Sequence, residues 1–248
     1  MRRMTTAATA AAMAGLVAVT SACGVELDPE EVRGTRTFPH AGAQVTITSA
    51  MGGLRVMPGA AGEVRVDRWL RGKAARDDNA SWSFDRGGLR LSADCTIVFG
   101  DCGARYHVRV PPGVRVVVRG AEDGVVVRDL AQDVEVTSPG PIRVYGTTGR
   151  LRLAGGDSLI AGDRLRSADV EARTTTGTIN LSFATPPDRL EMRSGDGRVT
   201  ATVPDGPYRV TATSTDGRKR SQLKSTPSER TIVATTGTGD IRLLTAKG

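Results

Sequence analysis

The chain has 248 residues, with 34 lysines and arginines against 27 acidic residues and a formal net charge of +7. This length suits one large all-β domain or two small ones. The arginines are scattered along the whole chain, as on solvent-facing strand positions. We expect no nucleic-acid partner, chiefly because the start of the chain indicates export from the cytoplasm. With only two histidines and three cysteines, the sequence gives little support for a metal centre, and we expect no cofactor.

Residues 1–22 have the pattern of an export signal: Arg2 and Arg3 come first, an uncharged stretch follows, and small residues precede Cys23. Such a segment is too short to span a bilayer as a mature helix. The stretch resembles bacterial lipoprotein signals of the actinobacterial type, although Thr20 stands where Leu is usual. The resemblance implies cleavage before Cys23 and acylation of that residue with chains such as palmitate. We expect a lipid-anchored protein on the extracytoplasmic face of the cell membrane. Cleavage of an ordinary signal and free secretion is the alternative.

Residues 23–42 are predicted to be a flexible tether. Residues 27–36 contain the run Asp-Pro-Glu-Glu and show no apolar periodicity, which is typical of a linker. Alternation of apolar and polar residues begins at Ala43. We therefore assign residues 43–248 to a single folded domain.

Cys95 and Cys102 are separated by Thr-Ile-Val-Phe-Gly-Asp. In an exported chain this spacing predicts a disulfide that closes a local hairpin. Closing such a loop would stabilise the fold by about 2.5 kcal/mol. Metal binding is the weaker alternative, because the two-residue gap of zinc sites is missing and only His40 and His107 could complete the ligand set.

From residue 43 onward, apolar residues alternate with Thr, Arg, Ser and Asp, as in Val114, Val116 and Val118. This is the period of half-buried strands. Turn sequences rich in Gly, Pro and Asp, such as Pro111-Pro112-Gly113, separate the runs. The pattern predicts an all-β fold.

An internal repeat is visible in the second half, where residues 134–144, 170–181, 190–201 and 232–243 each consist of strand, polar Gly turn and strand. One turn glycine per unit recurs at intervals of 16, 16, 21, 20, 20 and 22 residues: Gly124, Gly140, Gly156, Gly177, Gly197, Gly217 and Gly239. A spacing near 20 residues is typical of one solenoid coil, because a single unit can bury its apolar row only against its neighbours. The repeat predicts a single β-solenoid.

An immunoglobulin-like β-sandwich is the alternative fold. It would favour widely separated cysteines over a buried tryptophan. Neither Trp69 nor Trp82 lies between Cys95 and Cys102, and a sandwich has no reason to repeat its turn chemistry. The sequence therefore favours the solenoid.

The turn motifs Ser-Gly-Asp-Gly in residues 193–199 and Thr-Gly-Thr-Gly-Asp-Ile in residues 235–243 resemble those of the bacterial putative-adhesin family of unknown function. The resemblance extends over residues 43–245. It implies a β-solenoid that is often membrane-tethered or exported, with no established catalysis.

A catalytic site is not expected. Glycosidases need two carboxylates about 5–10 Å apart in a cleft, whereas the recurring acids here stand in turns, where Asp caps the backbone: Asp157, Asp196, Asp216 and Asp240. The calcium-binding nonapeptide frame and the usual hydrolase and phosphate-loop motifs are missing. Neither histidine has an evident nucleophile beside it.

Arg218, Lys219, Arg220 and Lys224 form the densest basic run. A contact with phosphates of lipid headgroups or wall polymers is one interpretation. The alternative is a solvated loop whose charges discourage pairing at a strand edge.

These observations predict a non-enzymatic, lipid-anchored surface protein, adhesin-like or otherwise a binding or structural module of the cell envelope. Its partners would be the membrane, through the lipid, and an envelope polymer or surface protein. The alternatives are a polysaccharide-active β-helix enzyme and a sensor domain for envelope stress. The oligomeric state is left open. Four aromatic residues are expected in the core, with a sugar-binding platform as the alternative: Trp69, Trp82, Phe84 and Phe99.

Overall fold

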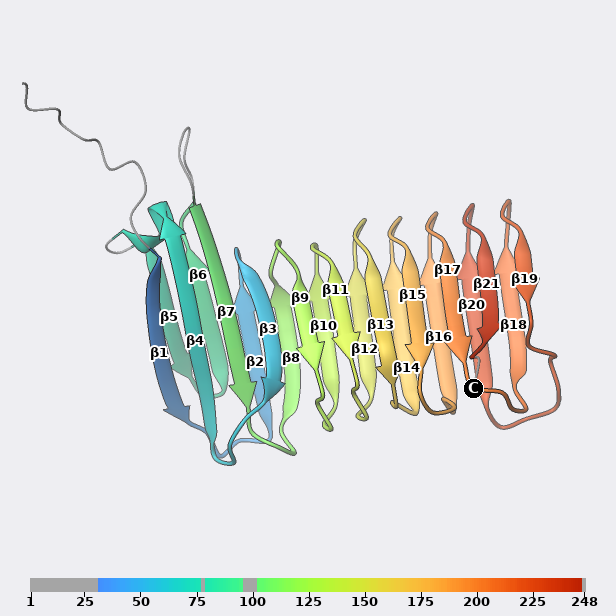
Figure 1. Cartoon of the computed structure of the whole chain (residues 1–248), viewed down its shortest axis with the longest axis horizontal. Coiled ribbons are helices and arrows are strands. Elements are labelled where there is room, and N and C mark those ends of the chain that lie inside the picture. The colour runs from blue at the N-terminus through green and yellow to red at the C-terminus, as the bar shows by residue number, and fades with distance from the viewer. Residues whose placement is uncertain (1–30, 77–78, 96–101, 247–248) are drawn as a thin grey trace, which may run out of the picture.

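The computed structural model describes residues 31–76, 79–95 and 102–246. The predicted export signal and Cys23 lie outside this range. Two long sheets of eleven and ten strands enclose one continuous apolar core (Figure 1). Most neighbouring strands are parallel, whereas an immunoglobulin-like sandwich is antiparallel. The predicted β-solenoid is confirmed, and the sandwich alternative is wrong.

The first sheet contains eleven strands in the spatial order β1 (Val32–Pro39), β4 (Glu63–Gly72), β7 (Cys102–Val110), β3 (Gly53–Pro58), β9 (Val125–Arg128), β11 (Ile142–Tyr145), β13 (Ile160–Leu165), β15 (Ile179–Phe183), β17 (Val199–Val203), β21 (Ile241–Thr245) and β19 (Lys219–Ser221). The second sheet contains β18 (Arg209–Ser214), β20 (Thr231–Thr236), β16 (Arg189–Ser194), β14 (Asp169–Thr174), β12 (Leu151–Gly155), β10 (Val134–Ser138), β8 (Arg115–Gly120), β2 (Gln44–Ser49), β6 (Gly88–Ala93) and β5 (Ala80–Asp85). One short 3-10 helix, η1 (Lys73–Ala75), follows β4.

Each coil consists of two consecutive strands, one in each sheet. Neighbouring coils pair in register, so equivalent side chains stack: Ile142, Ile160, Ile179, Val199 and Ile241 are consecutive partners in the first sheet and are fully buried. Burying a side chain of this size contributes about 1.5–3 kcal/mol. The alternation seen in the sequence is therefore the inward and outward alternation of one stacked ladder.

The order of coils departs from chain order at both ends. The coil β2–β3 lies between β6–β7 and β8–β9, and β20–β21 lies between β16–β17 and β18–β19. The last coil of the chain is thus held on both sides, and β18 and β19 form the edge. Sequence spacing did not predict this exchange, because an inserted coil has the same repeat length.

Buried hydroxyl groups explain the Ser/Thr position of the repeated turn. Ser194 Oγ accepts a hydrogen bond from Gly197 N at 2.8 Å and donates to Gly177 O of the preceding coil at 3.0 Å. In the next coil, Thr236 Oγ1 donates to Gly197 O at 3.0 Å. Each hydroxyl therefore satisfies one backbone group in its own turn and one in the neighbouring turn, as buried polar groups require.

The glycines of the same turns are required by close approach between coils. A Cβ atom on Gly197 would lie 1.9 Å from Gly177 O, and one on Gly239 would lie 2.1 Å from Gly197 O. No real Cβ contact is that short, so the stacking distance leaves room only for glycine. Gly156 differs, because a Cβ atom there would meet nothing within 4 Å.

The N-terminal end is closed by β1, β4 and β5, which pair antiparallel with their neighbours. Trp82 and Phe84 on β5 pack against the end of the core, whereas Trp69 lies on the outer face of the first sheet beside His107. The core interpretation therefore holds for Trp82 and Phe84 but not for Trp69. Phe99 lies outside the described residues.

The structure corrects the predicted tether over part of its length. Val32–Pro39 form β1, which pairs with β4 over all eight residues. None of its residues is fully buried, because β1 is an edge strand at the end of the solenoid. An edge strand without an inward apolar row has no periodicity to detect.

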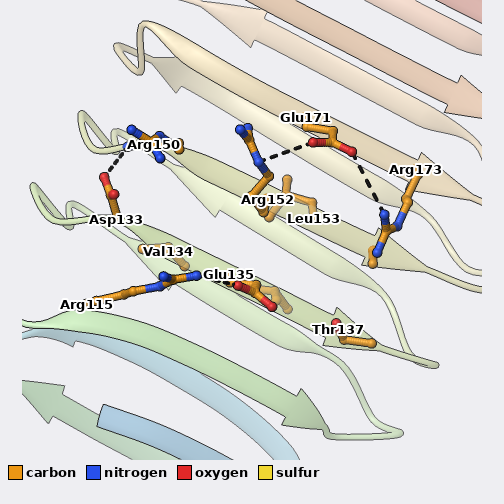
Figure 2. Close-up of a pocket in the computed structure, with 12 residues that line it drawn as sticks. Arg115, Asp133, Val134, Glu135, Thr137, Arg150, Arg152, Leu153, Glu171 and Arg173 are labelled. Carbon is orange, nitrogen blue, oxygen red and sulfur yellow. Dashed lines mark hydrogen bonds and ion pairs between the residues drawn. The ribbon is translucent and has the colours of Figure 1, made fainter. Parts of the chain in front are cut away.

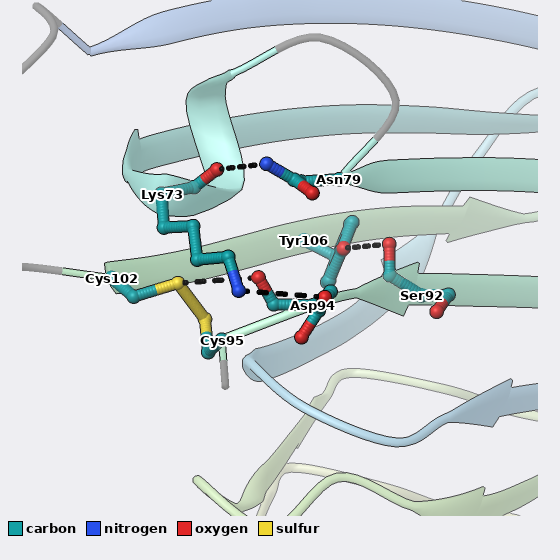
Figure 3. Close-up of a disulfide and its surroundings, with 7 residues drawn as sticks. All are labelled: Lys73, Asn79, Ser92, Asp94, Cys95, Cys102 and Tyr106. Carbon is teal, nitrogen blue, oxygen red and sulfur yellow. Dashed lines mark hydrogen bonds and ion pairs between the residues drawn. A yellow bond between two sulfur atoms is a disulfide. The ribbon is translucent and has the colours of Figure 1, made fainter. Parts of the chain in front are cut away.

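The structure joins Cys95 to Cys102, with their Cα atoms 5.5 Å apart (Figure 3). The bridge connects the segment after β6 in the second sheet to the first residue of β7 in the first sheet. Beside it, Lys73 Nζ lies 3.5 Å from Asp94 Oδ2, and Tyr106 Oη donates to Ser92 O at 3.4 Å. The two sheets are thereby linked covalently near the N-terminal end. Within the described ranges, no helix is long and apolar enough to cross a membrane.

Substitution of a stacked glycine tests the turn geometry. Gly197→Ala is expected to lower the free energy of unfolding by about 3 kcal/mol, because the new methyl group overlaps a backbone carbonyl. Gly156→Ala is the matched control and should leave stability unchanged or raise it by up to about 1 kcal/mol. Urea unfolding of both variants measures the difference. Equal stability of the two variants would contradict the stacking argument.

Candidate functional site

The outer face of the second sheet carries a ladder of charged side chains. In-register pairing places Glu135 beside Arg152, Arg152 beside Glu171, and Glu171 beside Glu191 on four successive strands. All four side chains alternate with buried residues and therefore point outward. Charged residues that are far apart in the sequence thus become direct neighbours in one row across the stacked strands.

Ion pairs connect this row. Arg115 Nη2 lies 2.7 Å from Glu135 Oε2, and Arg152 Nε lies 3.2 Å from Glu171 Oε2. Arg152 also donates to Asp169 Oδ1 at 3.1 Å, and this hydrogen bond is the main cause that raises the pKa of Arg152 above its usual value. The ladder is a network of shared charges rather than a set of separate surface pairs.

A pocket of about 340 Å³ opens on this face between β8, β10, β12 and β14 (Figure 2). Its wall combines hydrogen-bond donors and acceptors of both charges, and Val134 and Leu153 also line it. The charged residues of the wall are Arg115, Asp133, Glu135, Arg150, Arg152, Glu171 and Arg173. Such a lining suits a polar ligand that offers both donors and acceptors.

A polysaccharide-active enzyme would need two carboxylates about 5–10 Å apart. Two glutamates of the pocket meet the distance part of this requirement. Glu135 and Glu171 stand two strands apart, which places their backbones about 10 Å from each other. Arg152 lies between them and pairs with Glu171, while Arg115 pairs with Glu135. The carboxylates of Glu135 and Glu171 are therefore both engaged in ion pairs with guanidinium groups.

None of the four recurring turn aspartates lines the pocket, and three of them accept hydrogen bonds from neighbouring turns. Asp157 accepts from Thr176 Oγ1 at 2.8 Å, Asp196 accepts from Thr238 Oγ1 at 3.3 Å, and Asp240 accepts from Arg218 N at 3.0 Å. In the described part of the chain, no group of three or more His, Cys, Asp or Glu residues is placed to hold a metal ion.

The basic run lies at the opposite end of the solenoid from β1 (Figure 1). Arg218 pairs with Asp240 at 3.3 Å, and Lys219 and Arg220 are exposed on the edge strand β19. Lys219 is aligned with the buried Ile241 of the neighbouring strand, and a charge at such a position discourages pairing with further strands. Lys224 follows in the connection to β20. The contact with an anionic surface stays a prediction.

A second cluster on the outer face of the first sheet was missed by the sequence analysis. Asp67 accepts hydrogen bonds from Thr35 at 2.8 Å, from Arg65 at 3.3 Å and from Arg109. His107 is the direct cross-strand partner of Asp67 and lies with its ring centroid 4.5 Å from that of Trp69. The outward spacing Arg-x-Asp-x-Trp is visible in the sequence, but its antiparallel pairing with a strand about forty residues away is not.

The pKa values of Asp67 and His107 are both lower than their ordinary values. Burial raises the pKa of Asp67, but the hydrogen bonds from Thr35, Arg109 and Arg65 outweigh it and leave that pKa below its ordinary value. Burial lowers the pKa of His107, and Arg55, Arg105 and Arg109 lower it further against the opposing effect of Asp67. His107 is therefore favoured in its neutral form. His40 is buried elsewhere, against the edge of Phe84.

Residues 131–247 match the family model of Toastrack DUF4097, so the chain carries a Toastrack domain over this range. The resemblance inferred from the turn motifs is confirmed there. A search of curated proteins finds no match.

Similar solved structures include a putative cell adhesion protein from Clostridium sporogenes, at 8% identity over 88% of this chain and 100% of the other, with a TM-score of 0.38. A putative adhesin from Bacteroides fragilis shares 13% identity over 87% of this chain and 99% of its own, with a TM-score of 0.45. A putative adhesin from Parabacteroides merdae shares 8% identity over 86% and 96%, with a TM-score of 0.30.

The lowered pKa of His107 predicts a pH dependence of stability. The folded state resists protonation, so the stability contributed by neutral His107 is complete above the unfolded pKa of about 6.5 and declines as pH falls below it. Between about pH 7.5 and pH 5, the free energy of unfolding should fall more steeply in the parent chain than in His107→Gln. Urea unfolding across this range measures both slopes, and His40 is common to both chains. Parallel slopes would contradict the assignment.

Proposed function

We propose that the protein is a non-enzymatic binding module of the cell envelope, anchored by an acylated Cys23 on the extracytoplasmic face of the membrane. The observation that carries this proposal is the charged pocket on a stiff solenoid face. Its two glutamates are already paired with arginines, which suits recognition by exchange of hydrogen bonds rather than acid–base chemistry. The Toastrack domain supports a non-enzymatic role.

The proposed partner is an envelope polymer or a surface protein that presents polar groups to the second sheet. Rows of outward side chains on stacked coils form an extended surface, and solenoids commonly bind along such surfaces. The pocket between β8 and β14 would then seat one polar segment of a larger partner.

The alternative of a polysaccharide-active enzyme is less well supported. Arg152 separates the only two glutamates that line the pocket, and a substrate would have to displace it from Glu171. A sensor role in envelope stress would use the same surface, and nothing in the structure favours it over simple binding.

A charge-neutral double substitution tests the pocket. Arg152→Ala with Glu171→Ala should weaken binding of the chain to isolated cell envelopes by about tenfold or more, because both side chains line the pocket and pair with each other. Asn180→Ala with Thr200→Ala is the matched control, since both residues are outward partners on the first sheet. Co-sedimentation with envelopes measures both affinities. Equal loss in the two variants, or none in either, would overturn the assignment of the pocket.

Replacement of the cysteine tests the anchor. Cys23→Ala should move the protein from the membrane fraction to the soluble fraction, because a single weak contact cannot replace acyl chains. Membranes are washed at about 1 M salt, which screens electrostatic attachment. Retention of the washed variant on the membrane would reject the lipid anchor.

A further inference from the structure

The first sheet carries a dense arginine surface at the end from which the chain enters the solenoid. Five neighbouring strands, β4, β7, β3, β9 and β11, contribute arginines that alternate with buried residues and point outward. We call this surface the arginine face, and its members are Arg55, Arg65, Arg105, Arg109, Arg128 and Arg143.

The arginine face has fewer counter-charges than the outer face of the second sheet. One of them is Glu31, whose Oε2 lies 3.7 Å from Arg105 Nη2. Within the five strands, the three cross-strand rows that carry these arginines contain one carboxylate, Asp67. Arg65 and Arg109 already share it. On the second sheet, by contrast, arginines and carboxylates alternate in one network. On these five strands, positive charges therefore outnumber negative ones.

The arrangement brings like charges close together. Arg65 and Arg109 are direct cross-strand partners, and like charges in that position are destabilising. Arg55 is the cross-strand partner of His107, and its buried Nε has no hydrogen-bond partner. A solvent-exposed face that only maintained the fold would not need such a concentration of charge. A ligand that brings negative charge would relieve the repulsion.

Aromatic rings lie within the same surface. The guanidinium of Arg105 stacks 4.9 Å from the ring centroid of Trp69, and that of Arg128 stacks 4.4 Å from the centroid of Tyr145. Amphipathic rings and arginines together are typical of surfaces at a membrane interface. Five strands span about 20 Å, which is wide enough to meet several lipid headgroups at once.

The anchor position favours a membrane as the occupant. The strand β1 borders the arginine face and begins at Val32, nine residues after Cys23. Nine residues reach at most about 30 Å. We propose that the arginine face binds the anionic phospholipid headgroups of the leaflet that holds the anchor, so that the first sheet faces the membrane. This orientation rests on the proposed anchoring, and it directs the charged pocket of the second sheet away from the membrane, toward a partner.

Vesicle binding tests the proposal. The parent is the full chain with Cys23→Ser, which cannot be acylated, mixed with phosphatidylcholine vesicles with or without about one third phosphatidylglycerol. The arginine-face variant carries Arg65→Gln, Arg105→Gln and Arg143→Gln. Each neutralised charge should lower partitioning about fivefold, so the variant should bind anionic vesicles about 100-fold more weakly than the parent.

The matched control removes three exposed charges from the outer face of the second sheet, with Arg90→Gln, Arg119→Gln and Arg209→Gln. It should bind within about threefold of the parent, since charges beyond a Debye length of the membrane contribute little. If the triple variant of the arginine face does not fold, Arg143→Gln alone replaces it, with an expected loss of about fivefold.

Three results would overturn the proposal: equal losses in the two triple variants, equal binding of the parent to neutral and anionic vesicles, or binding of the parent to soluble polyphosphate but not to vesicles. The last result would assign the face to an anionic polymer. Because no chain in this assay is acylated, the assay can fail while the fractionation of Cys23→Ala succeeds, and the reverse can also occur.

Discussion

The spacing between coils at the repeated turns is the constraint on which the rest of the structure depends. A backbone carbonyl of one coil lies where a Cβ atom of the next would be, as at Gly177 and Gly197. Ser194 and Thr236 hold the same turns together through hydroxyl groups that bond to two coils at once. This contact aligns successive strands in register. Every outward side chain therefore has a defined neighbour on each side.

Register explains why the two outer faces differ although the fold repeats. On the second sheet, Glu135, Arg152 and Glu171 fall side by side and neutralise one another. On the first sheet, Arg65 and Arg109 fall side by side, and Asp67 alone compensates them. The same stacking thus produces a paired surface with a pocket and a positively charged surface near the predicted anchor. Two proposed contacts, with a partner and with the membrane, can then be made on opposite sides of one rigid body.

The solenoid could be predicted because its cause is local: Gly197 and its equivalents recur at the coil length. The strand β1 could not, because an edge strand has no buried row and reads as a linker. The exchanged order of the end coils also escaped prediction, since β20–β21 has the same motif whether it is last or inserted. The candidate sites were missed for a related reason. Asp67 and His107 meet only through antiparallel pairing of β4 with β7.

By itself, the sequence determined the all-β repeat, the cysteine pair and the turn chemistry, because each depends on residues close together in the chain. The Ser/Thr, Gly and Asp residues of a turn contact their own backbone and the equivalent turn of the next coil. One copy of the motif is therefore enough to predict most of the turn structure. Only the tertiary structure decided which charges lie together. Cross-coil neighbours such as Glu135 and Arg152 are about seventeen residues apart, and no local rule selects that pairing until the coils have stacked.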